Sequence, residues 1–224
     1  MRNKHSKDEK IDIFNDKYEF IGTATKKWAH QKGLWHRVFT CLIVNPKHKT
    51  VILQKKMPNR YLFKRLDYLD VSVGGHYLAG ESIQQGIREI EEEIGLKVKF
   101  KDLIPLGVRQ TAETVSKNYI ANEFQHIFIY PSTRKLQDYV LDNVEVNSLV
   151  EIRVQDAIDL LTKKTNKIKG KEIFIIDNKN KLKIIDITKQ DFVPSYLKKD
   201  QFFVKLFIAA KRYLNKETPS ELKI

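Results

Sequence analysis

The sequence predicts an α/β fold, because strand-like and helix-like segments alternate along most of its 224 residues. Apolar runs rich in β-branched residues lie on both sides of a helix-like stretch that starts near residue 82, and a second helical pattern lies near the C-terminal end. Hydrophobic residues make up 42% of the chain, which allows a sizeable core and excludes wholesale disorder. We expect a single domain over residues 1–224, with a core at about 20–165 and a C-terminal extension at about 166–224.

Turn-forming residues and apolar periodicity predict the elements in order. The N-terminal part has a hairpin at 11–14 and 20–24, a helical turn at 26–32 ending at Gly33, strands at 35–44 and 51–55, a basic loop at 57–66 and a strand at 69–73. After the central helix come strand-like segments at 98–108, 123–130 and 149–154, and a helix at 155–163. The extension has a basic connector at 164–171, a hairpin at 173–176 and 182–187, and an amphipathic helix within 191–215. The residues of this helix at core spacing are Phe202, Phe203, Leu206, Phe207 and Ala210.

The central helix has clear start and stop signals. Ser82 and Gln85, three residues apart, match a capping box, and Gly95 stands where helices commonly end. Isoleucines at positions 83, 87, 90 and 94 recur at helical spacing and form one narrow apolar stripe. The sequence therefore predicts a helix that packs on the core through isoleucine.

The polar side of this helix carries Glu89, Glu92 and Glu93. Glu89 and Glu93 are four residues apart, so as bare neighbours they repel each other by a few tenths of a kcal/mol. A divalent cation would remove the conflict, because hard ions such as Mg²⁺ bind carboxylate oxygens. A solvated acidic face on a surface helix is the alternative explanation for the glutamate run taken alone.

The stretch around this helix resembles the signature box of the Nudix hydrolase superfamily, G-x5-E-x7-R-E-U-x-E-E-x-G-U, where U is apolar. The positions that match by type are Gly75, Glu81, Arg88, Glu89, Ile90, Glu92, Glu93, Gly95 and Leu96. One departure is visible, since only six residues separate Glu81 from Arg88 where the common pattern has seven. The departure affects the placement of Glu81 more than the acidic face.

The resemblance implies a Nudix α/β/α sandwich with a mixed sheet, to which this chain adds a C-terminal hairpin and helix. It also implies hydrolysis of a diphosphate linkage in a nucleotide-like or other organic diphosphate, with Mg²⁺ or Mn²⁺ as cofactor. Such a cluster neutralises phosphate oxygens and activates a water. No tag of a particular substrate class follows the box, so the substrate stays open.

Roles for individual residues follow from the same resemblance. The expected metal ligands are Glu89, Glu92 and Glu93, with the backbone carbonyl near Gly75 as an addition. Arg88 and Glu81 are expected to orient these ligands rather than to touch substrate. The catalytic candidates are Glu89, Glu93 and, from a later strand, Glu123. A lone glutamate at a strand start is also commonly just exposed to solvent.

Three histidines, His30, His36 and His76, resemble the metal-binding trio of type I isopentenyl-diphosphate isomerase, a Nudix-fold relative. They form a candidate second metal site, with core or surface histidines as the alternative. That isomerase has an essential cysteine where this chain has Gly74, and the first glutamate of its E-x-E pattern where this chain has Ala121. Proton transfer to and from an alkene needs such acid and base groups, so isomerisation is the lesser alternative.

Composition gives weaker indications about partners. Lysine and arginine exceed aspartate and glutamate by 41 − 28 = 13 and suit anionic ligands, but they are scattered along the chain. A non-catalytic module that senses a nucleotide or binds nucleic acid is the third alternative, and strongly salt-dependent binding would identify it. We expect a cytoplasmic protein that acts on a small-molecule diphosphate, without membrane or nucleic-acid partners. Family habit favours a homodimer.

Overall fold

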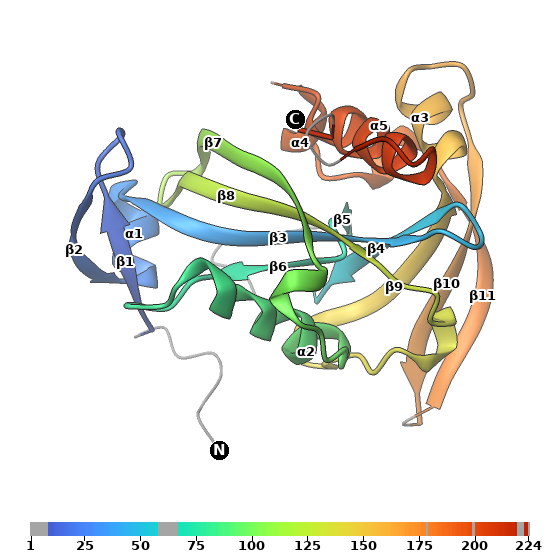
Figure 1. The fold of residues 1–224 in the computed structure, drawn as a ribbon, viewed down its shortest axis with the longest axis horizontal. Helices are drawn as coiled ribbons and strands as arrows, with labels where there is room; N and C mark the ends of the chain where they lie inside the picture. Colours follow the sequence, from blue (N-terminus) through green and yellow to red (C-terminus); the bar gives the residue numbers. More distant parts are fainter. Residues whose placement is uncertain (1–8, 58–66, 178, 199, 219–221, 224) are drawn as a thin grey trace.

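The computed structural model describes residues 9–57, 67–177, 179–198, 200–218 and 222–223. A mixed sheet lies between α2 on one side and α3, α4 and α5 on the other (Figure 1). The predicted α/β/α sandwich and its C-terminal hairpin and helix are therefore confirmed. The helices are α1 Lys26–Lys32, α2 Arg88–Ile94, α3 Val154–Leu161, α4 Ser195–Lys198 and α5 Phe202–Leu214.

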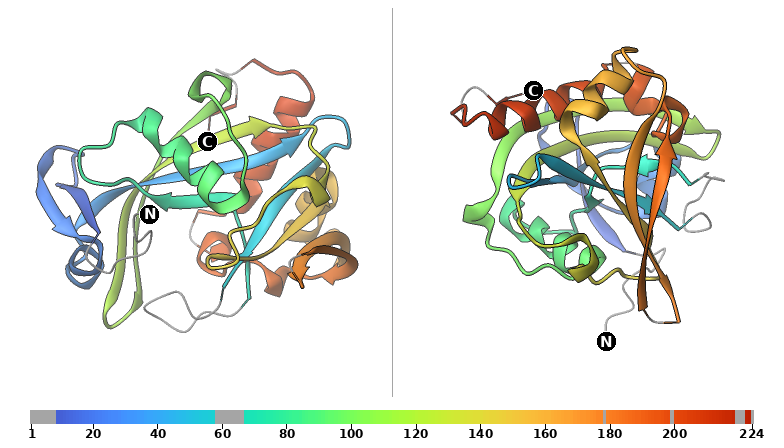
Figure 2. Two further views of the ribbon diagram at one scale, coloured as in Figure 1. Left: turned by 90° about the horizontal axis from the view of Figure 1, so that it is seen from below. Right: turned by 90° about the vertical axis from the view of Figure 1, so that its right-hand side faces the viewer.

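The strands join one sheet with the order β11-β10-β9-β4-β3-β1-β2, while β5, β6, β7 and β8 pair beside this path. Their bounds are β1 Lys10–Phe14, β2 Phe20–Thr25, β3 Trp35–Asn45, β4 Thr50–Lys56, β5 Leu69–Asp70, β6 Val73–His76, β7 Ile104–Ser116, β8 Tyr119–Pro131, β9 Val146–Arg153, β10 Ile168–Ile176 and β11 Lys179–Ile187. Figure 2 shows the β10–β11 hairpin continuing the sheet at one end and the β1–β2 hairpin at the other.

The long strand β3 determines which side chains meet at the centre. β8 runs parallel to it, and the register places Glu123 beside His36. On the other edge β6 runs antiparallel to it and places His76 beside Val38. Residues in register point to the same face of a sheet, and so do residues two apart. His36, His76 and Glu123 therefore share a face, although they come from three strands.

The signature helix begins with a 3₁₀ segment, η1 Ile83–Ile87, and becomes α-helical at Arg88. The predicted capping box at Ser82 and the stop at Gly95, which has φ of 65°, are both present. A 3₁₀ turn rises about 2.0 Å per residue and an α-helix about 1.5 Å, so η1 covers more length with fewer residues. With six residues between them, Arg88 and Glu81 still form two hydrogen bonds.

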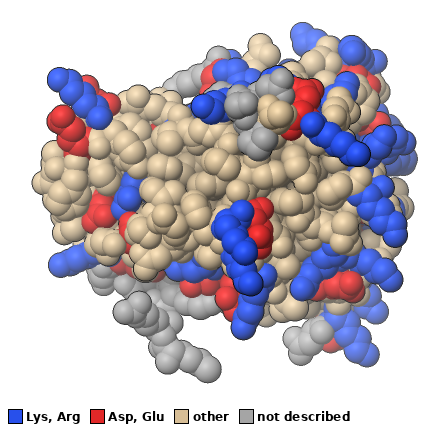
Figure 3. All heavy atoms as spheres, viewed as in Figure 1, with Lys and Arg blue, Asp and Glu red and all other residues tan. Residues whose placement is uncertain are grey.

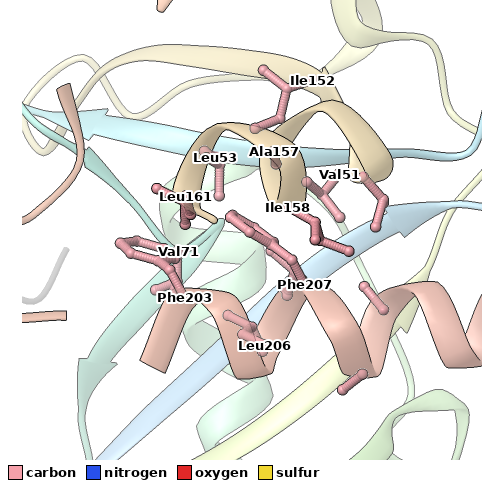
Figure 4. Packing of buried hydrophobic residues seen from close by; sticks show 14 of the residues in the cluster. Val51, Leu53, Val71, Ile152, Ala157, Ile158, Leu161, Phe203, Leu206 and Phe207 are labelled. Carbon is pink, nitrogen blue, oxygen red and sulfur yellow. The ribbon is translucent and has the colours of Figure 1, made fainter. Parts of the chain in front are cut away.

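The extension completes the core on the face opposite α2. Side chains of α5 pack with those of α3 and of the central strands, as Figure 4 shows for Phe203, Leu206 and Phe207 around Val71 and Ile158. The three α5 side chains have no exposed surface. The residues predicted to face the core from this helix do so, and α5 covers the sheet as an integral layer.

Two predicted strands differ from the structure. The segment at 98–108 becomes a strand only at Ile104, because Phe100 and Leu103 pack on the cluster around α2 and residues 100–102 form a 3₁₀ turn. The strand predicted at 69–73 is split into β5 and β6. There the Ser72 hydroxyl donates to the Ile52 carbonyl oxygen and accepts from the Ile43 amide, so a side chain replaces ladder bonds.

Other boundaries also moved. β10 starts at Ile168, inside the predicted connector, and β7 and β8 both extend beyond the predicted segments. Most of the predicted basic loop, residues 58–66, lies outside the described residues. No helix in the described ranges has the length and apolar character needed to span a membrane.

Candidate functional site

Arg88 is the centre of a polar network that joins the loop, α2 and β6. Its guanidinium donates to the Glu81 carboxylate from Nε at 2.6 Å and from Nη2 at 3.1 Å. It also donates to Glu89 Oε1 at 2.8 Å, to Glu92 Oε2 at 3.2 Å and to the His76 carbonyl oxygen at 2.8 Å. Five hydrogen bonds from one side chain thus fix the relative positions of Glu81, Glu89 and Glu92.

Glu93 is buried and lies where α2 meets β4 and β6. Its Oε2 accepts from Gln54 Nε2 at 3.0 Å and from the Gly74 amide at 3.1 Å. Its Oε1 lies 3.2 Å from Lys56 Nζ, which also donates to the Gly74 carbonyl oxygen at 2.8 Å. The Lys56 ammonium group therefore lies between the Glu93 carboxylate and the backbone carbonyl oxygen of Gly74, and its charge partly neutralises Glu93.

Glu89 packs directly on Gly75. A Cβ atom at Gly75 would lie 2.1 Å from Glu89 Cδ, so only glycine fits there. Burial raises the pKa of Glu89 to about 8, with Arg88 opposing the shift and Glu93 adding to it. Burial also raises the pKa of Glu93, against the effect of Lys56. Both carboxyl groups therefore hold a proton more readily than usual even beside Arg88 and Lys56, and a bound divalent cation would favour their ionised forms.

Within the described ranges, one group of at least three side chains has ligand atoms all within 4.8 Å of one another: His30, His36, His76 and Glu123. Nε2 of His30 lies 2.9 Å from Nε2 of His76, and Nε2 of His36 lies 3.9 Å from Glu123 Oε1. Tyr119 stacks on the His30 ring at 4.1 Å. We call these four residues the histidine centre.

The donors in the histidine centre fit a metal ion. His30 Nδ1 and His36 Nδ1 contact the carbonyl oxygens of Ile120 and Leu34 at 3.2 and 2.8 Å. A carbonyl accepts only, so each Nδ1 carries the hydrogen and each Nε2 presents a lone pair, as in metal-binding histidines. The buried His36 Nε2 has no hydrogen-bond partner among the residues that the structure describes. Such an atom is costly to bury unless a ligand satisfies it.

The imidazoles of the histidine centre favour the neutral form. Burial lowers the pKa of His30 to about 3, and it also lowers the pKa values of His36 and His76. Neutral imidazole is the form that binds metal. Three imidazoles and one carboxylate suit a transition-metal ion, whereas the carboxylates of the box and the Gly75 carbonyl suit Mg²⁺ or Mn²⁺.

A cavity of about 610 Å³ opens beside the histidine centre. Its walls include Glu123 and Tyr119 from β8, and Lys56 and Gly74 from the side of the box. The extension contributes another wall through residues 193–196. Of the three carboxylates expected to be catalytic, Glu123 lines this cavity. Glu93 contacts Lys56 and Gly74, which line it, whereas Glu89 contacts Arg88 and Gly75, which do not.

The structure thus brings together two sets of expected site residues. Arg88 holds Glu81, Glu89 and Glu92 in one set, and the histidines with Glu123 form the other. From the sequence, Glu123 is a candidate base separate from the histidines, because no local sequence pattern indicates that β3 and β8 pair in parallel. Lys56 stands at the edge of the basic loop noted in the sequence, whereas nothing in the sequence marked the cavity wall at 193–196.

Comparison with known proteins gives matches over most of the chain. The family pattern described as the NUDIX domain matches residues 34–173. An uncharacterized Nudix hydrolase of Clostridium acetobutylicum is 34% identical over 190 residues, which cover 84% of this chain and 91% of that protein. Isopentenyl-diphosphate delta-isomerase 2 of Photorhabdus laumondii is 29% identical over 54% of this chain and 66% of its own length.

Similarity to solved structures supports the fold. The crystal structure of DR0079 from Deinococcus radiodurans superimposes with a TM-score of 0.51 at 19% sequence identity. The match covers 69% of this chain and 90% of the Deinococcus protein.

Proposed function

The chain belongs to the Nudix hydrolase family, and on that premise we propose that it cleaves a diphosphate linkage in a nucleotide-like or other organic diphosphate with the help of Mg²⁺ or Mn²⁺. The observation that carries the proposal is the Arg88 network, which gathers Glu81, Glu89 and Glu92 beside β6, to whose Gly74 amide Glu93 is also hydrogen-bonded. Strand β6, which contains Gly74 and Gly75, and the side chain of Lys56 connect this network to the cavity. A diphosphate in the cavity would therefore lie between the box and the histidine centre.

The protein groups supply complementary parts of the reaction. A divalent cation, when bound, supplies charge for the phosphate oxygens and lowers the pKa of an attacking water. Glu89, Glu92 and Glu93 are proposed to hold it with the Gly75 carbonyl, while Arg88 and Glu81 orient them. Lys56 is placed to attract an anionic phosphate. Glu123 is the proposed carboxylate that faces the substrate directly.

The isomerase alternative is less well supported by the cavity wall. Gly74 and Ala121, which stand where the resemblance places a cysteine and a glutamate, both line the cavity without an acid or base. Cys41, the single cysteine of the chain, is buried in the cluster around α2, and burial raises the pKa of its thiol. It therefore offers no substitute for a thiol at position 74.

The nucleic-acid alternative depends on charge. In Figure 3 lysine and arginine gather most densely at the end of the molecule where β10 and β11 lie, and the middle of that face is largely uncharged. Many of these charges belong to ion pairs, such as that of Lys169 with Asp186. Hydrolysis of a small molecule remains our proposal.

The test is a panel of diphosphates assayed with Mg²⁺ or Mn²⁺: nucleoside di- and triphosphates, ADP-ribose, dinucleotides, thiamine diphosphate and isopentenyl diphosphate. Glu93→Gln should reduce turnover by about 10²- to 10⁴-fold, and removal of metal should abolish it. Glu91→Gln is the matched control, because Glu91 lies on the same helix but is exposed and forms an ion pair with Lys97, outside the Arg88 network. Equal activity of wild type and Glu93→Gln would contradict the proposal, and formation of dimethylallyl diphosphate would favour the isomerase.

A further inference from the structure

The carboxylate of Glu123 accepts a hydrogen bond from Gln125, which lies two residues further along β8. Gln125 Nε2 donates to Glu123 Oε2 at 2.7 Å, and Gln125 is 2% exposed. The other oxygen, Oε1, is the one that faces His36 Nε2. The two oxygens of Glu123 therefore have separate partners, one in the protein and one in the histidine centre.

The orientation of the Gln125 amide is fixed by Arg109 on the neighbouring strand β7. Arg109 pairs with Gln125 in register, and its Nη1 donates to Gln125 Oε1 at 2.7 Å. A guanidinium has donors only, so the amide oxygen must face Arg109 and the amide nitrogen must face Glu123. Reversing the amide would set donor against donor on one side and acceptor against acceptor on the other.

Arg109 is in turn held by the C-terminal extension. Asp200, two residues before α5, accepts from Arg109 Nε at 2.6 Å and from Nη2 at 3.1 Å, which is a bidentate pair. The guanidinium also lies over the rings of Phe202 at 4.6 Å and Tyr196 at 5.3 Å. Bidentate pairing and stacking on aromatic rings both fix the plane of an arginine.

We infer that the C-terminal extension sets the position of Glu123 in the histidine centre through the chain Asp200–Arg109–Gln125, and thereby sets how tightly that centre holds a divalent metal ion. The inference takes the histidine centre as a metal site, which its donor atoms fit, and goes beyond the proposed reaction, whose metal is assigned to the acids of the box. Asp200, Arg109 and Gln125 are positioning residues, since they act through Glu123. The same extension lines the cavity through residues 193–196, so its docking would complete the pocket and the metal site together.

The experiment measures binding of Mn²⁺ alone to the full-length protein by calorimetry and electron paramagnetic resonance. The site that disappears in His36→Ala defines the histidine centre. Gln125→Met keeps the size of the side chain but cannot donate to Glu123, and it should weaken Mn²⁺ binding at that site by about 10- to 100-fold. Asp200→Asn should weaken it in the same direction by a smaller factor.

Glu217→Gln is the matched control, because it weakens another arginine–carboxylate pair of the extension, with Arg212, that does not contact Glu123. Its Mn²⁺ affinity should equal that of wild type. Thermal unfolding in EDTA separates a positioning role from general loosening. A variant of Gln125 or Asp200 that unfolds at a lower temperature in EDTA but binds Mn²⁺ like wild type would contradict the proposed hydrogen-bond chain Asp200–Arg109–Gln125.

The outcomes distinguish this inference from the proposed function. If His36→Ala removes a Mn²⁺ site while Gln125→Met and Asp200→Asn bind like wild type, the inference is wrong and the metal site stands. If wild type has no site that His36→Ala removes, the histidine centre does not bind metal and the inference falls with it. If the affinities change as expected while no diphosphate in the panel is cleaved, the inference stands and the proposed reaction fails.

Discussion

Gly75 lies so close to the Glu89 carboxyl group that no side chain fits between them. Gly75→Ala should therefore push Glu89 away from Arg88, destabilise the protein by about 1–3 kcal/mol and lower activity. Gly74→Ala is the matched control for stability, because its Cβ would lie an ordinary 3.5 Å from Val71 Cγ2. Chemical unfolding of both variants measures the difference.

A double-mutant cycle identifies the cause of the Gly75→Ala effect. In a Glu89→Ala background the added methyl group has no carboxyl group to meet, so the same glycine substitution should cost less. An equal cost in both backgrounds would mean that the backbone, rather than Glu89, requires glycine at position 75.

A prediction about how stability depends on pH concerns His126, which belongs to neither candidate metal site. It is buried, its Nε2 lies 2.5 Å from the Tyr18 hydroxyl, and burial followed by the charge of Arg37 lowers its pKa to about 4. In the unfolded chain the pKa of the His126 imidazole is near 6.5, so between about pH 6.5 and 4 the unfolded chain binds a proton that the folded protein does not bind. The stability contribution of neutral His126 is complete above pH 6.5 and is lost as pH falls from about 6.5 to 4.

His126→Gln should remove this pH dependence and keep an acceptor for Tyr18. Between pH 7.5 and 5, the unfolding free energy of the variant should fall less steeply than that of wild type, by up to about 1.4 kcal/mol per pH unit. The other buried histidines are common to both proteins and cancel in the comparison. Urea unfolding at several pH values in EDTA checks this, and parallel curves would contradict the assignment.

Residues of the box could be recognised from the sequence because their partners lie within one loop and one helix. Arg88 and Glu81 are seven residues apart, and the network between them is local. The link between His36 and Glu123 depends on parallel pairing of distant strands, which no local pattern encodes. The chain from Glu123 to Asp200 depends in addition on where α5 docks, so the sequence alone could not predict it.

At the scale of elements, α5 shows which predictions amphipathic spacing supports. The pattern identified Phe202, Phe203, Leu206, Phe207 and Ala210 as the buried face, and all five are buried. The 98–103 segment shows the opposite case, because its apolar residues pack on α2 without strand pairing. Periodicity predicts which residues are buried more safely than it predicts the backbone conformation that buries them.

Two neighbouring residues of α5 test this layer. Phe207→Ala empties a fully buried position and should destabilise the protein by about 3–5 kcal/mol. Ile208→Ala removes an apolar side chain that is 42% exposed, so it should cost much less. Thermal or denaturant unfolding measures both, and equal losses would mean that α5 does not pack on the sheet as described.

At the scale of the whole molecule, the extension bears on whether this is one domain. β10 pairs with β9, so the sheet runs without a break from the core into the extension. One hydrophobic cluster contains β4, α3 and α5 side chains together. A single domain therefore remains our prediction, with the extension as a structural part of it rather than an appendage that could be removed.

Ending the chain after residue 188 tests this prediction. It would remove α5 and leave the large apolar face of α3 and the central strands in water. Burial of each large α5 side chain contributes about 1.5–3 kcal/mol, and four such residues, Phe202, Phe203, Leu206 and Phe207, together approach the 5–15 kcal/mol stability of a typical domain. The shortened chain should lack a cooperative unfolding transition, whereas the full chain should unfold in one step with equal calorimetric and van't Hoff enthalpies. Calorimetry and circular dichroism measure both, and a shortened chain that unfolds cooperatively would show that residues 1–188 form the folding unit and that α5 is docked on a finished core.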